Sequence, residues 1–435
     1  MYHPFIICES IAEKMKDPND IEDIVNNACV NHLYLTNKWM KGNFTDGCPG
    51  IAFFYSAMHD AFPEKGWDKI ADEYIKKALE FLKIEKIDNY SLFDGIAGLS
   101  LAVYHASIDK SYYNKLLSNL DEWLIEEINE SFINQSYQYQ DETTIIPNSF
   151  YAFAKGISGA IIYLLKRKDN PYLQELAKNC VNILSNIMLI QKKIDGNNVP
   201  AWFLTKKHLP IGNLKEQYPS GGFMSCMPFG LSGCLFALSF ALLENVSTPN
   251  LYQAVTTIAT WIKQKYSYIE NQKYWNNIIP VKEKIFPLPK EYDHWKYSWI
   301  SGWVPVMRTL YIAGKALKDD SIKSFAHNTY ISLLFENNMT DSNLCSFFSG
   351  IAGFMATSYL MAEETQDHRI FKEVNNLEKL LINTYNPTLP FGFQENINFE
   401  NNTFNIDSPG FAFGAAGIAL SLLVVNNKAK SHIFW

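Results

Sequence analysis

GLSGCLFALSFALL, residues 230–243, is the stretch that decides the fold of this chain. Two glycines separated by two residues begin it, and ten apolar or small residues follow without a polar face among them. A helix that is hydrophobic all round is buried on every side. The stretch therefore predicts a helix in the interior of the protein, which the chain enters through a glycine-containing turn.

The same pattern of Gly-x-x-Gly and an apolar run occurs six more times, which is the signature of a repeat architecture. The fifth copy is broken, because a proline replaces its second glycine. The other copies are GCPGIAFFYSAM from Gly47, GIAGLSLAVYH from Gly95, GISGAIIYLL from Gly156, GWVPVMRTLYIAG from Gly302, GIAGFMATSYLMA from Gly350 and GAAGIALSLLVV from Gly414.

Segments with 3.6-residue periodicity lie between these runs, for example residues 68–84, 170–188 and 250–266. Each has apolar residues on one side and Lys, Glu or Gln on the other, which predicts an amphipathic outer helix. Seven alternations predict an all-α fold, an α/α toroid with about fourteen helices in two rings. Glycine permits close backbone approach and unusual φ values, so we expect the seven Gly-x-x-Gly turns at one end of the ring. Taken singly, each glycine pair is explained by packing alone.

Three regions interrupt the alternation, at residues 106–150, 190–222 and 268–297. They are polar or rich in Pro, Trp and Tyr, and we expect long loops with short strands that wall a cleft at the glycine end. No stretch has the composition of a flexible interdomain linker. Residues 1–435 are therefore interpreted as a single domain.

Composition excludes several classes of protein. The net charge of −7 and the pI of about 5.8 give no basic footprint for nucleic acid. The longest clean apolar run, residues 418–425, is too short to span a bilayer. The first twenty residues lack the positive and apolar regions of a secretion signal. Seven scattered cysteines indicate reduced thiols, so we expect a cytoplasmic protein.

Three segments resemble the lanthionine synthetase C-like (LanC-like) family, the lantibiotic cyclases. They are YPSGGFMSCMPFGLSG (218–233), similar to the family's YPNG…AHGxxG, SWISG (298–302), similar to SWCYG, and FSGIAG (348–353), similar to CHGxxG. The resemblance covers nearly the whole chain and implies an α/α toroid. Members of the family bind one Zn²⁺ through Cys, Cys and His. The metal holds a peptide cysteine as thiolate, which adds to a dehydroalanine or dehydrobutyrine to close a thioether ring.

The metal ligands that the resemblance implies are missing from the matching positions. The first cysteine falls on Ile300, and the Cys-His pair falls on Phe348 and Ser349. Hydrocarbon side chains have no electron pair to offer a metal, and a zinc site needs several donors. The resemblance therefore implies a divergent member with no bound cofactor.

The remaining functional positions are also changed. The histidine of AHG falls on Phe229, the aspartate before the third Gly-x-x-Gly on Ala152, and the tyrosine after the first cysteine on Ser301. The arginine upstream falls on Lys296, the one conservative change. With Trp299, these positions predict an apolar binding pocket at the degenerate active site, and no catalytic residue is assigned.

A displaced metal site is a weaker alternative. Cys226 and Cys345 each lie three residues before the lost position in their own repeat, and His294 lies six residues before Ile300. Free cysteines are commonly small buried residues, which is the favoured interpretation of both. The other histidines have no ligand spacing, and no Gly-x-Ser-x-Gly elbow is present.

Aromatic residues are frequent near the expected mouth of the toroid. Each alone is explained by loop packing, whereas together they would suit a groove for an extended peptide. They are Tyr218, Phe223, Phe229, Trp295, Tyr297, Trp299, Trp303, Phe347 and Phe348.

The favoured hypothesis is a pseudoenzyme in the biosynthesis of a ribosomally made, lanthipeptide-like peptide. It would bind a precursor peptide, or a modifying enzyme such as a dehydratase, with a peripheral membrane complex left open. The alternative is an active peptide cyclase without metal or with the displaced zinc site, because proximity alone lowers a barrier. A toroid for glycan or lipid-like ligands is the weakest of the three.

Overall fold

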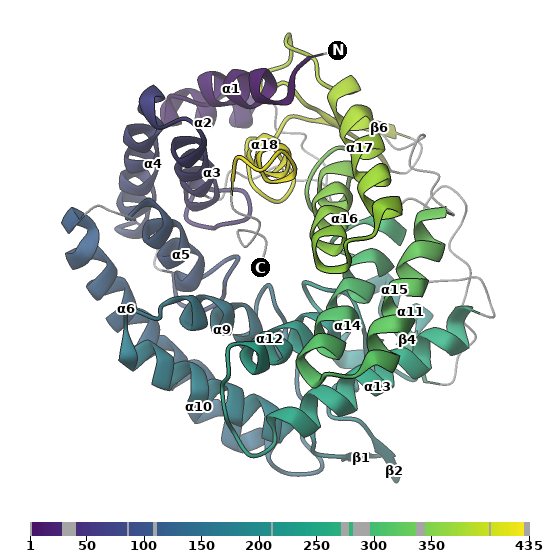
Figure 1. The fold of residues 1–435 in the computed structure, drawn as a ribbon. Coiled ribbons are helices and arrows are strands. Elements are labelled where there is room, and N and C mark those ends of the chain that lie inside the picture. Colours follow the sequence, from purple (N-terminus) through teal and green to yellow (C-terminus); the bar gives the residue numbers. More distant parts are fainter. Residues whose placement is uncertain are drawn as a thin grey trace.

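The computed structural model describes residues 2–27, 41–84, 87–107, 111–209, 212–270, 278–281, 296–335, 344–399 and 402–429. Within these ranges the helices form two concentric rings (Figure 1). The inner ring consists of α3 (Cys48–Ala61), α5 (Ile96–Ala106), α9 (Ile157–Lys166), α12 (Leu231–Leu243), α14 (Trp303–Leu317), α16 (Ile351–Thr365) and α18 (Ala415–Val425). The outer ring consists of α1 (Pro4–Lys14), α4 (Trp67–Leu82), α6 (Asn114–Ile128), α10 (Pro171–Met188), α13 (Leu251–Glu270), α15 (Asp320–Phe335) and α17 (His368–Asn383).

The other elements are short. The helical ones are α2 (Pro18–Asn27), η1 (Pro63–Lys65), η2 (Ser111–Tyr113), η3 (Asn129–Ile133), α7 (Asn134–Ser136), η4 (Tyr137–Tyr139), α8 (Asn148–Tyr151), η5 (Lys206–His208) and α11 (Gly212–Gln217). Three antiparallel strand pairs complete the described part of the chain: β1 (Lys192–Ile194) with β2 (Asn197–Val199), β3 (Gly222–Met224) with β4 (Ile278–Pro280), and β5 (Glu395–Phe399) with β6 (Asn402–Ile406).

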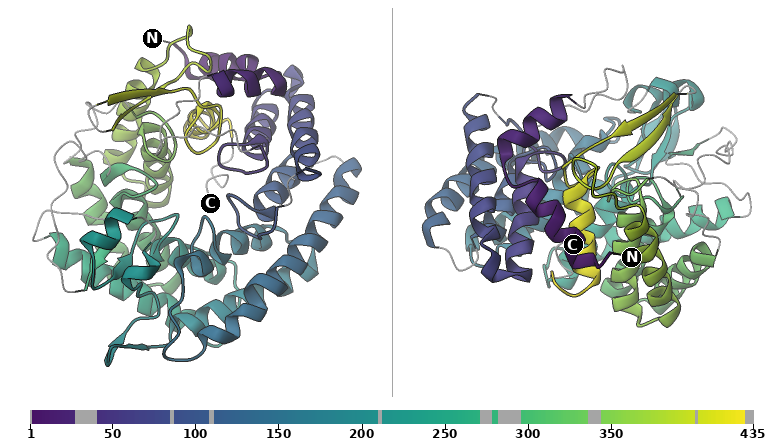
Figure 2. Two further views of the ribbon diagram at one scale, coloured as in Figure 1. Left: turned by 180° about the vertical axis from the view of Figure 1, so that it is seen from behind. Right: turned by 90° about the horizontal axis from the view of Figure 1, so that it is seen from above.

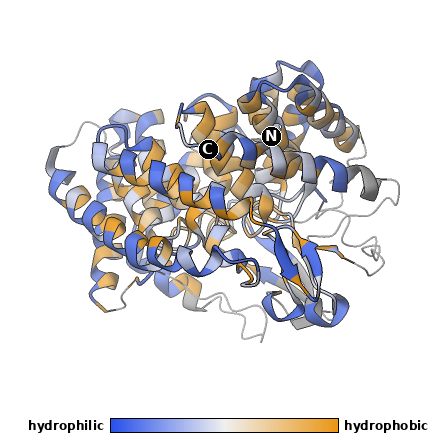
Figure 3. Ribbon diagram, turned by 90° about the horizontal axis from the view of Figure 1, so that it is seen from below, coloured by the Kyte–Doolittle hydropathy of each residue, from blue (hydrophilic) through white to orange (hydrophobic). Residues whose placement is uncertain are grey.

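Each inner helix packs against its two neighbours in the ring and against at least one outer helix. The predicted double ring is therefore confirmed, and the first glycines of the seven repeats lie at the N-termini of the inner helices. The inner helices are mostly apolar, whereas the outer helices carry both hydrophilic and hydrophobic residues (Figure 3). The first outer helix, α1, covers the last inner helix, α18, so the beginning and the end of the chain close the ring together (Figures 1 and 2).

We number the repeats 1 to 7 by their first glycines: Gly47, Gly95, Gly156, Gly230, Gly302, Gly350 and Gly414. The four residues before each first glycine are its repeat loop, and the end of the ring that these loops form is the loop face. The first glycines have extended backbone with negative φ. The expected need for unusual φ values is therefore wrong at these positions.

Close packing explains the glycines instead. A Cβ on the second glycine of a repeat would overlap the carbonyl oxygen of the residue six positions earlier, for example Phe347 below Gly353 and Leu92 below Gly98. The Cβ of a side chain from the preceding repeat loop also packs against each second glycine, as the Cβ of Phe44 packs against Gly98. In repeat 5 the second glycine is replaced by Pro305 in the first turn of α14, where a missing N–H leaves no helical hydrogen bond unmade.

Main-chain hydrogen bonds join the repeat loops into a circle. The carbonyl acceptor in each case is the residue two positions before the first glycine of the next repeat. The series is interrupted between repeats 4 and 5, because Pro228 has no N–H to donate toward repeat 5. The N–H to O distances are Phe44 to Phe93 2.8 Å, Phe93 to Ala154 3.3 Å, Ala154 to Pro228 2.8 Å, Ile300 to Phe348 2.9 Å, Phe348 to Ala412 2.8 Å and Ala412 to Thr45 2.7 Å.

Apolar side chains of the repeat loops meet across the ring, where Trp299 contacts Phe93, Phe153 and Phe348. The side chains three positions before each first glycine belong to the same core. All are apolar and at most 4% exposed: Phe44, Leu92, Phe153, Met227, Trp299, Phe347 and Phe411. The toroid is therefore closed by a hydrophobic plug just below the loop face. Among the described residues, no helix is both long and apolar enough to cross a membrane.

The three expected loop regions match the structure to different extents. Residues 190–222 contain the short strands β1 and β2 and end at the first residue of β3, and the described part of 268–297 contains β4. The interpretation of 106–150 as a long loop is wrong, because the outer helix α6 lies within it. The helix buries Leu117, Leu120, Leu124 and Ile128 at helical spacing, but a fifth buried position, Asp121, is acidic and obscures the pattern.

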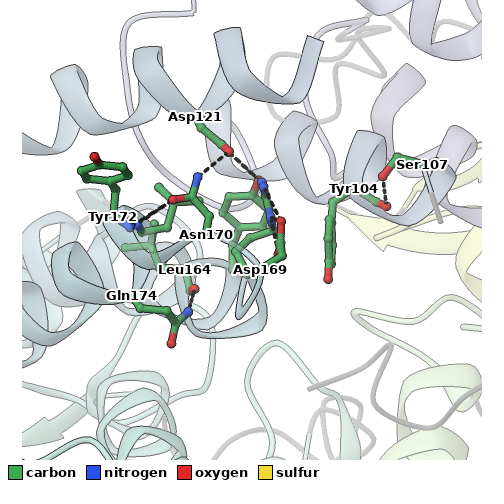
Figure 4. A network of polar contacts seen from close by, with 11 residues as sticks. Tyr104, Ser107, Asp121, Leu164, Asp169, Asn170, Tyr172 and Gln174 are labelled. Atoms are coloured by element: carbon green, nitrogen blue, oxygen red, sulfur yellow. Dashed lines mark hydrogen bonds and ion pairs between the residues drawn. The ribbon is translucent and has the colours of Figure 1, made fainter. Parts of the chain in front are cut away.

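Asp121 is part of a buried polar network that ties α6 to α9 and α10 (Figure 4). Its carboxylate accepts hydrogen bonds from Arg167 Nη1 at 2.7 Å, Tyr163 Oη at 3.0 Å and Asn170 Nδ2 at 3.1 Å. Arg167 also pairs with Asp169 at 3.0 Å. A buried charge pair is tolerated when hydrogen bonds satisfy both partners, and here they do so for both.

Replacing Gly98 by Ala tests the packing explanation. Helix propensity alone predicts a gain of about 1 kcal/mol, whereas overlap with the Leu92 carbonyl predicts a loss of about 1–3 kcal/mol. We expect the loss, measured as the urea midpoint. Ser100→Ala, two residues further along the same buried helix, is the matched control, and a stabilised Gly98→Ala variant contradicts the explanation.

Replacing Asp121 by Leu is expected to cost about 3–5 kcal/mol, because it leaves the Arg167 guanidinium buried with one carboxylate fewer. The double variant Asp121→Leu/Arg167→Leu should recover part of this loss in chemical unfolding. A double variant no more stable than the single one would show that the charge is not the cause.

Candidate functional site

The positions predicted for the degenerate site do lie on the loop face. Ile300 donates its main-chain N–H to the carbonyl of Phe348 at 2.9 Å, which joins the loops of repeats 5 and 6 directly. Ser349 follows Phe348, and Phe229 ends the loop of repeat 4. Residues 229, 300 and 348 are far apart in sequence, and the circle of repeat loops brings them to one end of the ring.

Trp299 and Phe348 are less accessible than the sequence suggested. Their rings stack with centroids 4.8 Å apart, and Phe348 is only 2% exposed. Phe413, the last residue of the repeat 7 loop, covers Phe348 edge-on at 5.2 Å and is itself 36% exposed. The apolar surface of the loop face is therefore provided by Phe413, Phe229 and Ile300, of which the last two are half-buried.

Most of the other aromatic residues belong to the core. Trp295 lies outside the described residues. The rest are at most 5% exposed, so the idea that they line a groove is wrong and loop packing explains them: Tyr218, Phe223, Tyr297, Trp303 and Phe347.

Ser349, at the position that matches the family's histidine ligand, turns away from the loop face. Its hydroxyl lies 2.8 Å from Ser346 Oγ and 3.2 Å from Glu395 Oε2. Glu395 begins β5, is 3% exposed and also accepts the main-chain N–H of Ser346 at 2.8 Å. Burial raises the pKa of the Glu395 carboxyl, and the hydrogen bonds from Ser346 and Ser349 oppose the rise. The hydroxyl of Ser349 is thus committed to a buried carboxyl.

The remaining predicted positions have structural partners. The Ser301 hydroxyl lies 2.8 Å from that of Ser298, the same arrangement as Ser349 with Ser346. Ala152 is fully buried, and its main-chain N–H donates to the Asn148 carbonyl at 2.8 Å. Lys296 is half-buried, and its carbonyl packs against Gly302.

The displaced cysteines are buried thiols. Cys226 is 1% exposed, and burial raises the pKa of its thiol to about 12. The thiol of Cys345 donates to the Gln394 carbonyl at 3.7 Å, and burial, followed by the Glu395 charge, raises its pKa well above the usual range. Zinc is bound by the thiolate form, which such surroundings disfavour. His294 lies outside the described residues.

These observations decide whether the residues present fit a zinc ion. Ile300 and Phe348 have no donor atoms, and Ser349 is held by Ser346 and Glu395. No group of three His, Cys, Asp or Glu side chains within the described ranges is placed to hold a metal. The described donor set at this position does not fit zinc.

The opposite half of the loop face is charged, which the sequence interpretation missed. The last residues of repeat loops 1, 2 and 3 are Asp46, Asp94 and Lys155. Lys155 Nζ pairs with Asp94 Oδ2 at 3.1 Å. Burial and then the Asp94 charge raise the pKa of Asp46 from 3.8 to about 7. The available signal was the residue before each first glycine, which is charged in repeats 1–3, a serine in repeats 5 and 6, and a phenylalanine in repeats 4 and 7.

A narrow cavity lies under the plug, between α14 and α16. Trp299, Met227 and Phe347 separate it from the loop face, and Arg308 and Thr309 line its wall. Arg308 is 9% exposed, with its guanidinium 5.8 Å from the ring of Phe236. This space is beneath the predicted pocket, so the predicted binding positions do not line it, apart from Trp299.

Comparison with known proteins agrees with this architecture. The family model for lanthionine synthetase C-like proteins matches residues 38–435. The chain belongs to this lanthionine synthetase C-like family. The nisin biosynthesis protein NisC of Lactococcus lactis subsp. lactis is 23% identical over 358 residues, which are 81% of this chain and 82% of that protein. The solved structure of a nisin cyclase superposes with a TM-score of 0.72 at 19% identity and covers 95% of both chains. The latter likeness establishes the helical toroid of this LanC-like chain.

The pKa of Asp46 leads to a prediction about stability. A raised pKa means that the folded protein holds a proton that the unfolded chain releases, so this stabilisation is complete below about pH 4 and is lost as the pH rises toward 7. Asp46→Asn should therefore be more stable than the parent at pH 8, by roughly 1–3 kcal/mol, and equal to it near pH 4.

Chemical unfolding between pH 4 and pH 8 measures the difference. Glu64→Gln is the matched control, because Glu64 is an exposed carboxylate just beyond the other end of α3. A variant Asp46→Asn that is less stable than the parent at pH 8 would show that the charged carboxylate stabilises the loop.

Proposed function

We propose that this LanC-like protein binds a precursor peptide in the biosynthesis of a lanthipeptide-like product, without using zinc. The observation that carries the proposal is the state of the three positions matched to the metal ligands. Ile300 and Phe348 are joined through their main chains and present only carbon, and Ser349 is bonded to Glu395. The scaffold remains complete, while the donor atoms that zinc chemistry requires are replaced.

The loop face supplies the surface for the peptide. Phe413, Phe229 and Ile300 present apolar side chains, and aromatic contacts of this kind give a large contact area at low entropic cost. A relative named for nisin biosynthesis and a structure named nisin cyclase support a peptide of the same class. In this proposal a dehydratase or another modifying enzyme is the further partner, which the bound peptide would bring to the complex.

The alternative function is a metal-free cyclase. A carboxyl with a pKa of about 7 is suited to general-base work at neutral pH, and Asp46 lies on the same face as the apolar residues. A peptide thiol would give its proton to Asp46, its sulfur would bond to the β-carbon of a dehydro residue, and a proton would be added at the α-carbon. This reaction consumes one thiol per ring, which separates it from binding.

Metal content is the first test. After dialysis against a mild chelator, we expect substoichiometric zinc in the parent and in the Cys226→Ala/Cys345→Ala variant alike, measured by elemental analysis. About one zinc per chain in the parent and none in the variant would establish the displaced site and revive the enzyme.

Peptide binding is the second test, with a dehydrated, cysteine-containing lanthipeptide precursor as probe. Phe413→Asp and Phe229→Asp should each weaken binding about tenfold or more in calorimetry, because a carboxylate replaces apolar contact area. Tyr172→Asp, at an exposed tyrosine on α10, is the control. Loss of free thiol on incubation with the parent, abolished by Asp46→Asn, would favour the cyclase. Equal affinity of parent and both Phe variants contradicts the proposed site.

A further inference from the structure

We propose that the joint between repeats 4 and 5 holds an extended segment of the bound peptide by its main chain, with a peptide N–H donating to the carbonyl of Ile300. This assignment rests on the proposed function and refines it, because it names the atom of the loop face that the peptide contacts. A peptide bound in this way takes the part that a neighbouring repeat loop has at the other joints of the ring.

The joint between repeats 4 and 5 lacks the main-chain hydrogen bond that every other joint has. At the six other joints, the carbonyl two positions before the first glycine accepts an N–H from the preceding repeat loop at 2.7–3.3 Å. Pro228 has the donor position in repeat 4 and carries no N–H. Among the described residues, no main-chain N–H donates to the Ile300 carbonyl. One acceptor of the circle is therefore unused.

A second proline loosens the packing at the same joint. At the six other joints, a Cβ added to the second glycine would lie 2.5–3.2 Å from a Cβ of the preceding repeat loop. Repeat 5 has Pro305 at this position, and its ring excludes such a close approach. The narrow cavity under the plug is lined by both Pro305 and Met227, the residue of the repeat 4 loop that corresponds to the close contacts elsewhere. Protein interiors are otherwise close-packed, so this joint is less tightly filled than the others.

Ile300 is also the accessible member of its set. The residues two positions before the first glycines are buried in the six other repeats, whereas Ile300 is half-buried. Phe229, which follows Pro228, is half-buried as well. The unused carbonyl therefore belongs to a residue that reaches the surface of the loop face, where apolar side chains surround it. The buried members of the set are Thr45, Phe93, Ala154, Pro228, Phe348 and Ala412.

These three features define the guest. An extended peptide presents main-chain N–H groups along its edge while its side chains alternate between two faces. Extended peptides bind to unpaired main-chain groups in this way, with affinity from the main chain and specificity from alternate side chains. At this joint an apolar side chain of the peptide would lie on Phe229 and Ile300. A peptide residue without an N–H, such as proline, is excluded from the position that faces the carbonyl.

Replacing amides of the peptide by esters tests the contact. The probe is a dehydrated, cysteine-containing lanthipeptide precursor made by chemical synthesis, in which one main-chain N–H at a time is replaced by an ester oxygen. We expect one position at which the ester weakens binding to the parent about five- to tenfold in calorimetry, because one hydrogen bond is lost.

Pro228→Ala supplies the missing donor from the protein itself. The new N–H should bond to the Ile300 carbonyl, so its hydrogen exchange should be at least about tenfold slower than in the unfolded chain. The all-amide precursor should bind this variant about five- to tenfold more weakly than the parent, and the sensitive ester should bind it as well as the all-amide precursor does. Pro249→Ala, at an exposed proline between α12 and α13, is the matched control and should leave both affinities as in the parent.

An ester series without a sensitive position, or an ester effect of the same size in Pro228→Ala, overturns the main-chain contact while peptide binding stands. Exchange at residue 228 as fast as in the unfolded chain, in a variant that is folded by circular dichroism, overturns it as well. Failure of the all-amide precursor to bind the parent overturns the proposed function together with the contact. If Pro228→Ala does not fold, the ester series on the parent decides, because it needs no variant.

Discussion

The close contact between the second glycine and the carbonyl oxygen six residues earlier, made in six of the seven repeats, is the constraint on which the structure depends. Without a Cβ, the repeat loop folds back onto the N-terminus of its own helix. In this position the residue two before the first glycine reaches its neighbour's main chain, and the preceding residue enters the central plug. None of these contacts uses the side chain that ends the repeat loop, so residue types as different as Phe229, Ser349 and Asp46 occur at this position.

Sequence patterns were sufficient for this architecture because apolar periodicity and glycine spacing report directly on packing. The helices Trp67–Leu82 and Pro171–Met188 follow the amphipathic segments closely. Helix α6 was missed because the side chain at one of its buried positions is Asp121, whose burial is paid for by Arg167, 46 residues away. Such long-range compensation leaves no local pattern in the sequence.

The candidate site was predictable in its position but not in its surface. The family resemblance placed Ile300, Phe348 and Ser349 at one end, and the hydrogen bond between the first two agrees. The family resemblance did not indicate which of these side chains are covered by other side chains. The ring of Phe413 covers Phe348, and the Glu395 carboxylate in β5 accepts a hydrogen bond from the Ser349 hydroxyl. Phe413 and Glu395 both lie in the connection between α17 and α18, where the sequence had no distinctive motif. Exposure depends on tertiary cover, which residue types alone do not define.

The pairing of α1 with α18 has a consequence for how the ring is made. The thiol of Cys8 donates to the carbonyl of Ala419, across 411 residues, and Lys14 reaches the carbonyls of Pro387 and Leu389. During synthesis, the apolar side of α1 has no partner until α18 has been made. The growing chain is an open arc with one uncovered edge at each end, and such edges invite association with other chains. Closure of the ring thus waits for α18, whose contact with α1 joins the two ends of the arc.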